Sequence, residues 1–203
     1  MKSEDTYKTI ASPTEEILFK EKNSKFFGYA FPISEEAEIK PILETLRKKF
    51  PDAGHFCYAY QIGSTDISYR ANDDGEPSNS AGMPIYGQIQ SKGLTNIIIV
   101  VIRYFGGTKL GVGGLISAYR TTAQMSLEQA EIIEKTVDIH LVITFDYQNI
   151  NKVMRLIKEK NLTIVSQSME MACEIEVTTR KGNLPEVQAS FENLFGVTLK
   201  LKA

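Results

Sequence analysis

The 203-residue sequence predicts an α+β protein with two domains, residues 1–135 and 136–203. Two observations favour this class. Runs with the two-residue period of strands alternate with runs at helical spacing along the chain. In addition, a very apolar strand pattern at 96–105 leads through a glycine-rich loop into a long helical pattern. The composition, 42% hydrophobic and 24% charged, is ordinary for a globular protein.

The first domain is expected to be a sandwich with helices on one face of a mixed sheet. Its strand patterns lie at 15–20, 25–31, 55–62, 67–70 and 96–105. Its helical patterns lie at 35–50 and 113–134, and a further short helix is expected within 78–91. Ser34 is the expected N-cap of the first helix, because three glutamates follow in a turn where negative charge suits the helix dipole. The strand at 96–105 is apolar on both faces, which predicts a central position in the sheet.

The second domain has the clearer pattern. Its strands are expected at 137–145, 162–167, 172–178 and 197–201, and its helices at 150–157 and 184–195. Gly196 is a suitable stop signal for the last helix. The order β-α-β-β-α-β is that of the ferredoxin-like split unit, so we expect a ferredoxin-like domain.

Charge and cysteine usage limit the possible partners and compartment. The net charge of −2 supplies no global basic field, so any RNA contact requires a local patch. Cys57 and Cys173 each lie in a strand-like apolar run, which favours buried reduced thiols over a disulfide. No signal peptide is apparent, and the longest apolar run, Ile97–Ile102, is too short to span a bilayer. We therefore expect a cytoplasmic protein.

The segment from the apolar strand into the following helix carries the strongest functional signal. Glycines leave backbone N–H groups accessible, and a helix start suits an anion, above all a phosphate. Lysine and arginine would add donors for phosphate oxygens, and a tyrosine could stack on a base. The expected anion or nucleic-acid site comprises Arg103, Tyr104, Gly106, Gly107, Lys109, Gly111, Gly113, Gly114 and Arg120. The alternative is that the glycines only permit a tight turn and close packing.

A second cluster is the acidic turn at residues 73–77. Its three carboxylates could hold Mg²⁺, but Asp-Gly followed by Pro is also turn chemistry, and a carboxylate could cap the next helix or pair with an arginine. His55 and Cys57 would share one face of a strand, without an orienting third residue or an oxyanion hole. We therefore assign no catalytic residue, metal or cofactor. The accessory residues of the expected site are His55, Asp73, Asp74 and Glu76.

Four motifs together resemble those of the IMPACT/YigZ family, in the family's order and at its spacing. They lie at His55–Tyr60, Asp73–Ser78, Ala81–Ile85 and Arg103–Leu115. The chain departs from the family pattern at Asn79 and Ser80, where Gly-Thr is usual. Because asparagine is a common non-glycine residue at positive φ, we expect Asn79 to preserve the turn.

The resemblance implies a fold and a role. It implies a first domain like the second domain of ribosomal protein S5 and a second domain similar to the last domain of elongation factor G. Eukaryotic relatives regulate translation by binding a partner that controls an initiation-factor kinase pathway. The expected function is therefore that of a non-enzymatic binding protein in translation or its regulation, acting through RNA, the ribosome or a ribosome-associated partner. Two alternatives are a magnesium-dependent enzyme for a phosphorylated small molecule and a pure protein-interaction module.

Overall fold

The computed structural model describes residues 5–170 and 173–202. The chain forms two compact units, Tyr7–Lys135 and the segment from Thr136 onward, and Asp5 and Thr6 group with the latter. Each unit has its own sheet and apolar core. Within the described ranges, no helix combines the length and the apolar character needed to cross a membrane.

The first unit is built on a five-stranded sheet with the strand order β2-β3-β6-β4-β5. These strands are β2 (Ile17–Glu21), β3 (Ser24–Pro32), β4 (His55–Ile62), β5 (Ser68–Asn72) and β6 (Ile97–Tyr104). Every neighbouring pair is antiparallel, so the expectation of a mixed sheet was wrong. The reason is that β6 enters between β3 and β4 and runs opposite to both, while β2–β3 and β4–β5 pair with their sequence neighbours.

The β2–β3 turn has a local cause in the sequence. Lys22 and Asn23 have φ values of 44° and 64°. Two successive residues at positive φ are what a tight hairpin turn requires, because their twist matches that of the flanking strands. This turn lies against the glycine loop described below.

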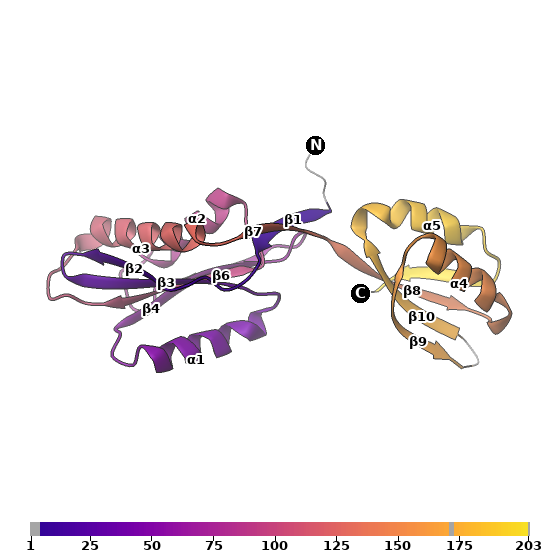
Figure 1. The fold of residues 1–203 in the computed structure, drawn as a ribbon, viewed down its shortest axis with the longest axis horizontal. Coiled ribbons are helices and arrows are strands. Elements are labelled where there is room, and N and C mark those ends of the chain that lie inside the picture. The colour runs from indigo at the N-terminus through magenta and orange to yellow at the C-terminus, as the bar shows by residue number, and fades with distance from the viewer. Residues whose placement is uncertain (1–4, 171–172, 203) are drawn as a thin grey trace. The chain divides into compact units, whose positions relative to one another are not determined.

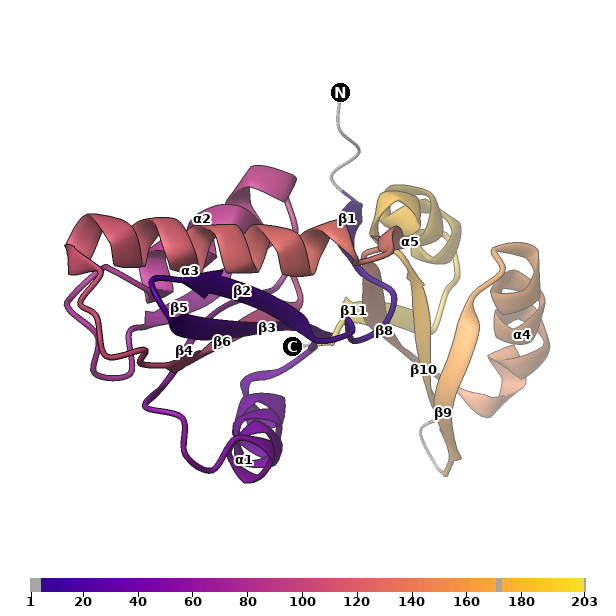
Figure 2. The same cartoon turned by 60° about the vertical axis from the view of Figure 1, so that its left-hand side comes forward.

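Helices cover both faces of this sheet, which corrects the one-face expectation. In Figure 1, α1 (Ile39–Lys49) lies on one side of the sheet, and α2 (Gly82–Lys92) and α3 (Gly111–Glu128) lie on the other. The turned view in Figure 2 shows α3 running along β2 and β3. Strand β6 is apolar on both faces for this reason. Its alternate residues Ile97, Ile99 and Val101 pack in the core beneath α2 and α3, and Ile98, Val100 and Ile102 pack in the α1 core.

The start of α1 differs in detail from the expected Ser34 cap. A short 3₁₀ turn, η1 (Glu36–Glu38), precedes the helix, and Glu35 is its N-cap in a capping box with Glu38. The backbone N–H and the hydroxyl of Ser34 both donate to the Glu38 carboxylate, at 2.6 and 2.7 Å. The helix ends at Lys49, close to the end expected before Pro51.

The helix expected at 113–134 occupies Gly111–Glu128 instead. The segment after it forms strand β7 (Ile132–Thr136), which pairs with β1 (Thr6–Ile10) in a two-stranded sheet. Helical spacing continues through this segment in sequence, but its partner lies more than a hundred residues away. A long-range strand pairing has therefore overridden a local pattern.

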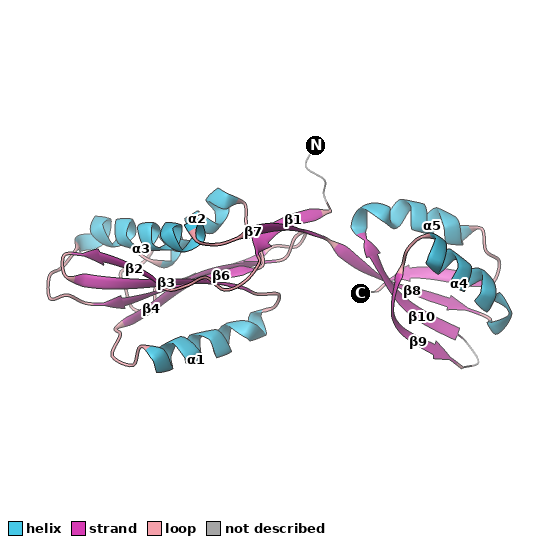
Figure 3. Ribbon diagram, in the orientation of Figure 1, coloured by secondary structure: helices cyan, strands magenta, loops and turns pink. Residues whose placement is uncertain are grey.

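The second unit has the element order predicted from the sequence. It contains β8 (Asp138–Phe145), α4 (Ile150–Glu159), β9 (Thr163–Met169), β10 (Cys173–Arg180), α5 (Leu184–Glu192) and β11 (Val197–Leu201), with 3₁₀ turns η2 (Tyr147–Asn149) and η3 (Lys181–Asn183). The sheet order is β11-β8-β10-β9, with antiparallel neighbours. Figure 3 shows α4 and α5 on the same face of this sheet, and their apolar residues share one core with alternate residues of β8 and β10.

Candidate functional site

The glycine loop, residues 105–110, links the end of β6 to the start of α3. The backbone N–H of Gly106 donates to the hydroxyl of buried Ser24 at 3.2 Å. A Cβ on Gly106 would lie 2.0 Å from the backbone carbon of Asn23. Gly107 and Gly111 have φ values of +82° and +74°. Glycine is therefore required at these three positions by the protein's own packing and backbone conformation.

Gly113 differs from these three positions. It lies in the first turn of α3, it is exposed, and its φ is in the ordinary negative range. A Cβ built there meets no atom within 4 Å, whereas one on the neighbouring Gly114 would meet the Leu110 side chain at 3.0 Å. Neither packing nor backbone conformation requires Gly113 to be glycine.

The first turn of α3 is uncapped. Its N-cap residue, Leu110, supplies no side-chain hydrogen bond, and the turn contains no acidic residue. The first N–H groups of a helix lack partners within the helix, and they carry its positive dipole end. Val112 and Lys109 are exposed beside them. The arrangement can accept an anion at the backbone.

Arg103 and Tyr104 do not line one groove, although both belong to the expected site. Consecutive strand residues point to opposite faces of a sheet. Arg103 is only 5% exposed and faces the side of α2 and α3. Tyr104 lies on the α1 side, where its ring contacts those of Phe27 and Phe50. The sheet therefore separates the two residues.

Arg103 is held in a buried ion pair. Its Nη1 donates to Oε1 of Glu76 at 2.7 Å, and its Nη2 lies 3.4 Å from the hydroxyl of Ser24. Tyr119 of α3 donates its hydroxyl to the same Glu76 oxygen, also at 2.7 Å. The side chains of Arg103 and Glu76 are 6% and 4% exposed. We expected Arg103 to face an anionic ligand; here its anion is a carboxylate of the protein.

The acidic turn also serves the fold. Asp73 accepts hydrogen bonds from the backbone N–H groups of Asn79, Ala81 and Gly82 at 2.8 to 2.9 Å, which holds the start of α2. Asp74 accepts the N–H of Phe56 at 2.7 Å. With Glu76 paired to Arg103, all three carboxylates are bound by the chain itself. In residues 5–170 and 173–202, no cluster of three or more possible protein ligands is placed to hold a metal ion.

Asn79 has a φ of +60°, as expected at the position where the sequence departs from the family motif. The side chain of asparagine tolerates this left-handed conformation better than other non-glycine residues. The turn persists, and its N–H remains available to Asp73.

We predict that Asp73→Ala lowers the free energy of unfolding of the first unit by about 2 kcal/mol, since three N–H groups at the start of α2 lose their acceptor. Urea unfolding followed by circular dichroism measures the change. Asp52→Ala removes an exposed carboxylate with no hydrogen bond among the described residues and is expected to match the wild type. Equal unfolding midpoints for both variants would contradict the capping role.

His55 and Cys57 each bond to the acidic turn rather than to each other. Nδ1 of His55 donates to the carbonyl oxygen of Asp74 at 2.9 Å, and its Nε2 lies 3.9 Å from Glu76. The Cys57 thiol donates to the carbonyl of Asp73 at 3.0 Å. Burial raises the pKa of the Cys57 thiol well above its usual range. The thiol therefore keeps its proton at neutral pH and is a poor nucleophile.

Burial likewise raises the pKa of Tyr119, which keeps its proton to donate to Glu76. Arg103, Glu76, Tyr119, Cys57 and His55 thus form one polar network beneath the helices. The network joins β4, β6, α3 and the acidic turn, and it positions the strand end from which the glycine loop leaves.

A pocket beside Tyr104 was missed in the sequence. It has a volume of about 340 Å³ and is lined by Asn23, Lys25, Phe27, Phe50, Tyr104 and Phe105. The ring of Phe105, in the glycine loop, is 57% exposed. Lys25 lies opposite Tyr104 in the β3–β6 register. Only that register brings the two together, so no local sequence signal could have found the pocket.

The fold and these surfaces define a two-unit α+β protein in which buried polar residues maintain the shape and an exposed loop and an aromatic pocket face solvent. Residues 22–127 match the Impact N-terminal domain. The chain belongs to the IMPACT family.

Relatives match over most of the chain. IMPACT family member YvyE of Bacillus subtilis is 32% identical over 175 residues, which are 84% of this chain and 80% of that protein. The IMPACT family member in the pol 5′ region of Thermus thermophilus is 35% identical over 141 residues, 70% of this chain and 75% of that one. A crystal structure described as that of a hypothetical protein is similar with a TM-score of 0.75 at 26% identity, covering 98% of this chain and 97% of its own.

Proposed function

We propose that this chain is a non-enzymatic binding protein of the cytoplasm that acts in translation or its regulation, and that its ligand is RNA, free or on the ribosome. The family resemblance supports the setting in translation. The proposed contact surface combines the first turn of α3, Lys109 and Arg120 with the neighbouring aromatic pocket. The three accessory carboxylates and His55 serve this surface indirectly, by holding the fold under it.

The observation that carries the proposal is the bare backbone at Gly113. Glycine in the middle of a helix costs about 0.5–1 kcal/mol relative to alanine, and this range is an upper bound for the first turn, where Gly113 lies. Neither packing nor a positive φ requires glycine here, because a Cβ would meet open space. A ligand that approaches the backbone closely accounts for this cost. A phosphate group fits the uncapped N–H groups of the same turn.

The aromatic pocket supplies the second element of the proposal. The rings of Tyr104 and of Phe105, the first residue of the glycine loop, line this pocket, and Lys25 lines it as well. Stacking of a base on an aromatic side chain contributes about 1–3 kcal/mol and tolerates any base. Single-stranded RNA would thus place a base in the pocket and phosphates along the loop.

We further propose that the first unit resembles the second domain of ribosomal protein S5 and that the second unit is ferredoxin-like, similar to the last domain of elongation factor G. The β-α-β-β-α-β order and the sheet order β11-β8-β10-β9 support the second assignment. The alternative of a magnesium-dependent enzyme draws no support from an acidic turn whose carboxylates are bound by the chain.

We predict that full-length protein binds fluorescein-labelled single-stranded RNA with an affinity that falls as salt rises, because each neutralised phosphate releases counterions. The double variant Lys25→Ala/Lys109→Ala is expected to bind every sequence more weakly and to reduce the magnitude of the slope of log K against log salt by about 0.7 per lost phosphate contact, the value for single strands. Gly113→Ala is expected to weaken binding as well while raising the melting temperature. Fluorescence anisotropy and thermal unfolding measure these quantities.

The matched control is Lys152→Ala, which removes an exposed lysine from α4 of the second unit and is expected to bind like the wild type. Unchanged RNA binding in both Lys25→Ala/Lys109→Ala and Gly113→Ala would refute the proposed surface. Capture of the same partner proteins from cytosol before and after RNase treatment, without RNA binding in vitro, would favour the protein-interaction module instead.

A further inference from the structure

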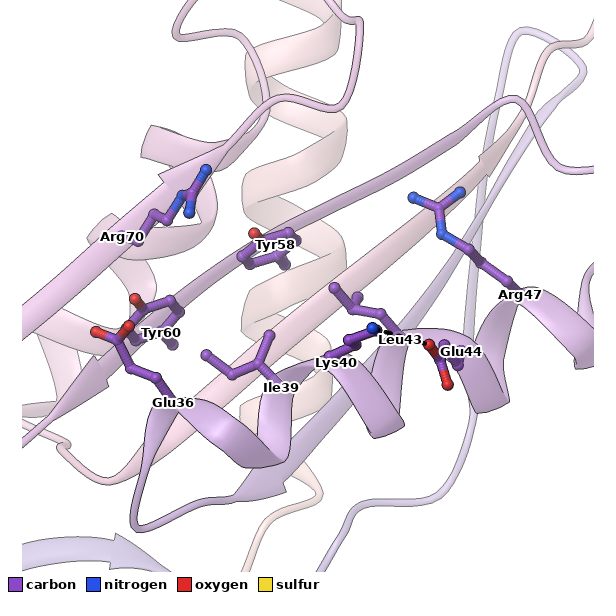
Figure 4. A pocket seen from close by; sticks show the side chains of 9 residues that line it. All are labelled: Glu36, Ile39, Lys40, Leu43, Glu44, Arg47, Tyr58, Tyr60 and Arg70. Carbon is purple, nitrogen blue, oxygen red and sulfur yellow. Dashed lines mark ion pairs between the residues drawn. The ribbon is translucent and has the colours of Figure 1, made fainter.

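A second pocket lies on the α1 side of the first unit, between α1 and the strands β4 and β5. Its volume is about 330 Å³. It exists because α1 covers the middle of the sheet and leaves the edge strand β5 open, with Ser68, Tyr69 and Arg70 exposed. Figure 4 shows this pocket from close by.

One wall and the floor of the pocket are apolar or aromatic. Ile39 and Leu43 of α1 face the rings of Tyr58 and Tyr60, which are alternate residues of β4 and therefore point to the same face. The Tyr60 hydroxyl bonds to Glu36, and burial together with this bond raises the pKa of Tyr60 to about 12. Tyr60 is therefore a neutral part of the floor.

Polar contacts tie α1 to the β5 side at both ends of the pocket. At one end the Ser68 hydroxyl donates to Glu36 at 3.1 Å. At the other end Arg47 forms an ion pair with Asp74 at 3.3 Å, and its guanidinium lies 4.4 Å from the centre of the Phe56 ring. A through-going groove would admit a peptide. A pocket whose two ends are bridged by polar contacts suits a compact small molecule. Its volume lies at the lower end of the range found for small-molecule sites.

Two hydrogen-bond donors that line this pocket, the Arg70 guanidinium and the Tyr58 hydroxyl, are available to bind a ligand. Arg70 makes no ion pair with any described residue, and it lines the pocket together with Tyr58 (Figure 4). Tyr58 accepts a weak hydrogen bond from Nδ2 of Asn72 at 3.4 Å, which leaves its own O–H free to donate. Lys40, by contrast, lies 3.9 Å from Glu44. A guanidinium and a phenol together bind a carboxylate or a phosphate well, because both donors add charge-assisted hydrogen bonds.

We propose that this pocket binds a small organic anion with a flat or apolar body. Arg70 and the Tyr58 hydroxyl hold its carboxylate or phosphate, and its body packs against Ile39, Leu43 and the tyrosine rings. Glu36 and Glu44 at the rim disfavour a polyanion, which distinguishes this site from the surface proposed for RNA. The ligand is thus a metabolite-sized molecule, and the pocket is independent of the glycine loop.

The test uses ¹⁵N-labelled full-length protein titrated with adenosine monophosphate, benzoate and inorganic phosphate. The first two carry a ring with a phosphate or a carboxylate, and the third carries no ring. Saturable amide shifts are expected in β4, β5 and α1 with at least one ring-bearing probe, and with inorganic phosphate only at much higher concentration. Arg70→Ala is expected to weaken the binding about tenfold and Tyr58→Phe about threefold, because Arg70 is a cationic donor and the Tyr58 hydroxyl is a neutral one.

Lys20→Ala is the control, because Lys20 is an exposed cation on β2, the opposite edge strand of the same sheet. It is expected to leave the affinity unchanged. Absence of saturable shifts with all three probes would overturn the proposal. Shifts that saturate equally in Arg70→Ala, or that appear only around the glycine loop, would overturn it as well. A phosphate-only or carboxylate-only response among the ring-bearing probes identifies which anion the pocket selects.

Discussion

Replacing Glu76 with glutamine is expected to lower the free energy of unfolding of the first unit by about 3 kcal/mol, since it leaves a buried guanidinium without its counter-charge. Arg103 and Tyr119 both donate to one oxygen of Glu76, and the Arg103 and Glu76 side chains are almost fully buried. The Nε of Arg103 already lacks a partner among the described residues. Loss of the carboxylate would leave the most buried cation of this network poorly satisfied.

Urea unfolding monitored by tyrosine fluorescence and circular dichroism measures the effect. Glu186→Gln is the matched control, because it removes an exposed carboxylate from an ion pair with Lys160 and is expected to change stability by less than about 1 kcal/mol. A double replacement, Glu76→Leu with Arg103→Met, is expected to be less destabilised than Glu76→Gln, because both charges leave together. Wild-type stability in Glu76→Gln would show that the pair contributes little.

The free energy of unfolding of Glu76→Gln determines how the effects of Arg103 variants on ligand binding are interpreted. If Arg103 holds the core of the first unit, Arg103→Ala loses ligand binding only because the protein unfolds more easily. Exposed Lys109 and Lys25 therefore test the RNA surface more directly than Arg103, although Arg103 belongs to the most distinctive motif of the sequence.

Replacing Gly106 with alanine is expected to destabilise the first unit by about 3 kcal/mol, the upper end of the usual cost of overpacking. The added Cβ would lie 2.0 Å from the carbon of Asn23 and 2.3 Å from the nitrogen of Ser24. Both are backbone atoms of the β2–β3 turn, so no side-chain rotation relieves the overlap. Movement of that turn would also disturb Ser24, whose hydroxyl accepts the N–H of Gly106.

The informative comparison is with Gly113→Ala, which lies seven positions further along the same motif. Open space and a helical backbone at Gly113 predict a gain of up to about 1 kcal/mol there, because alanine loses less backbone entropy on folding. Thermal and urea unfolding of the two variants side by side measure the opposite signs. Equal destabilisation by both would mean that Gly113 has a structural role, and the argument for a ligand at the bare backbone would fail.

The two glycine predictions assign different roles to glycines of one motif: Gly106 is needed for folding, and Gly113 is proposed to be needed for binding. Gly106, Gly107 and Gly111 are explained by packing or by positive φ, as in the alternative in which the glycines only permit a tight turn and close packing. Gly113 has no such explanation in the described chain. The sequence alone does not separate these positions, since all of them are glycines within eight residues.

Much of the secondary structure could be predicted because its causes are local. Alternation along residues 137–145 and helical spacing along 150–157 correspond to β8 and α4, and the last strand, Val197–Leu201, was predicted to the residue. The positive φ at Asn79 followed from residue type. The buried free cysteines also agree with the prediction from their apolar surroundings.

The errors have a common cause. The helix expected to reach residue 134 stops at Glu128, because a strand from the other end of the chain pairs with the residues that follow. The sheet is antiparallel and covered on both faces, although the apolar pattern of β6 was compatible with a mixed sheet. The period of a sequence pattern shows which faces of a segment are apolar. It does not identify the strand or helix that pairs with the segment or packs on it.

Three properties of this protein could be predicted from residue types and spacings: its family, its two-part α+β organisation, and the order of strands and helices in the second unit. These depend on residue types and short spacings, which act between neighbours in the chain. The folded chain was needed to show that Arg103 is paired with Glu76, that Tyr104 faces the opposite side of the sheet, and that Lys25 and Tyr104 line one pocket. Those facts depend on strand register and on burial, and both are set by contacts between residues that lie far apart in sequence.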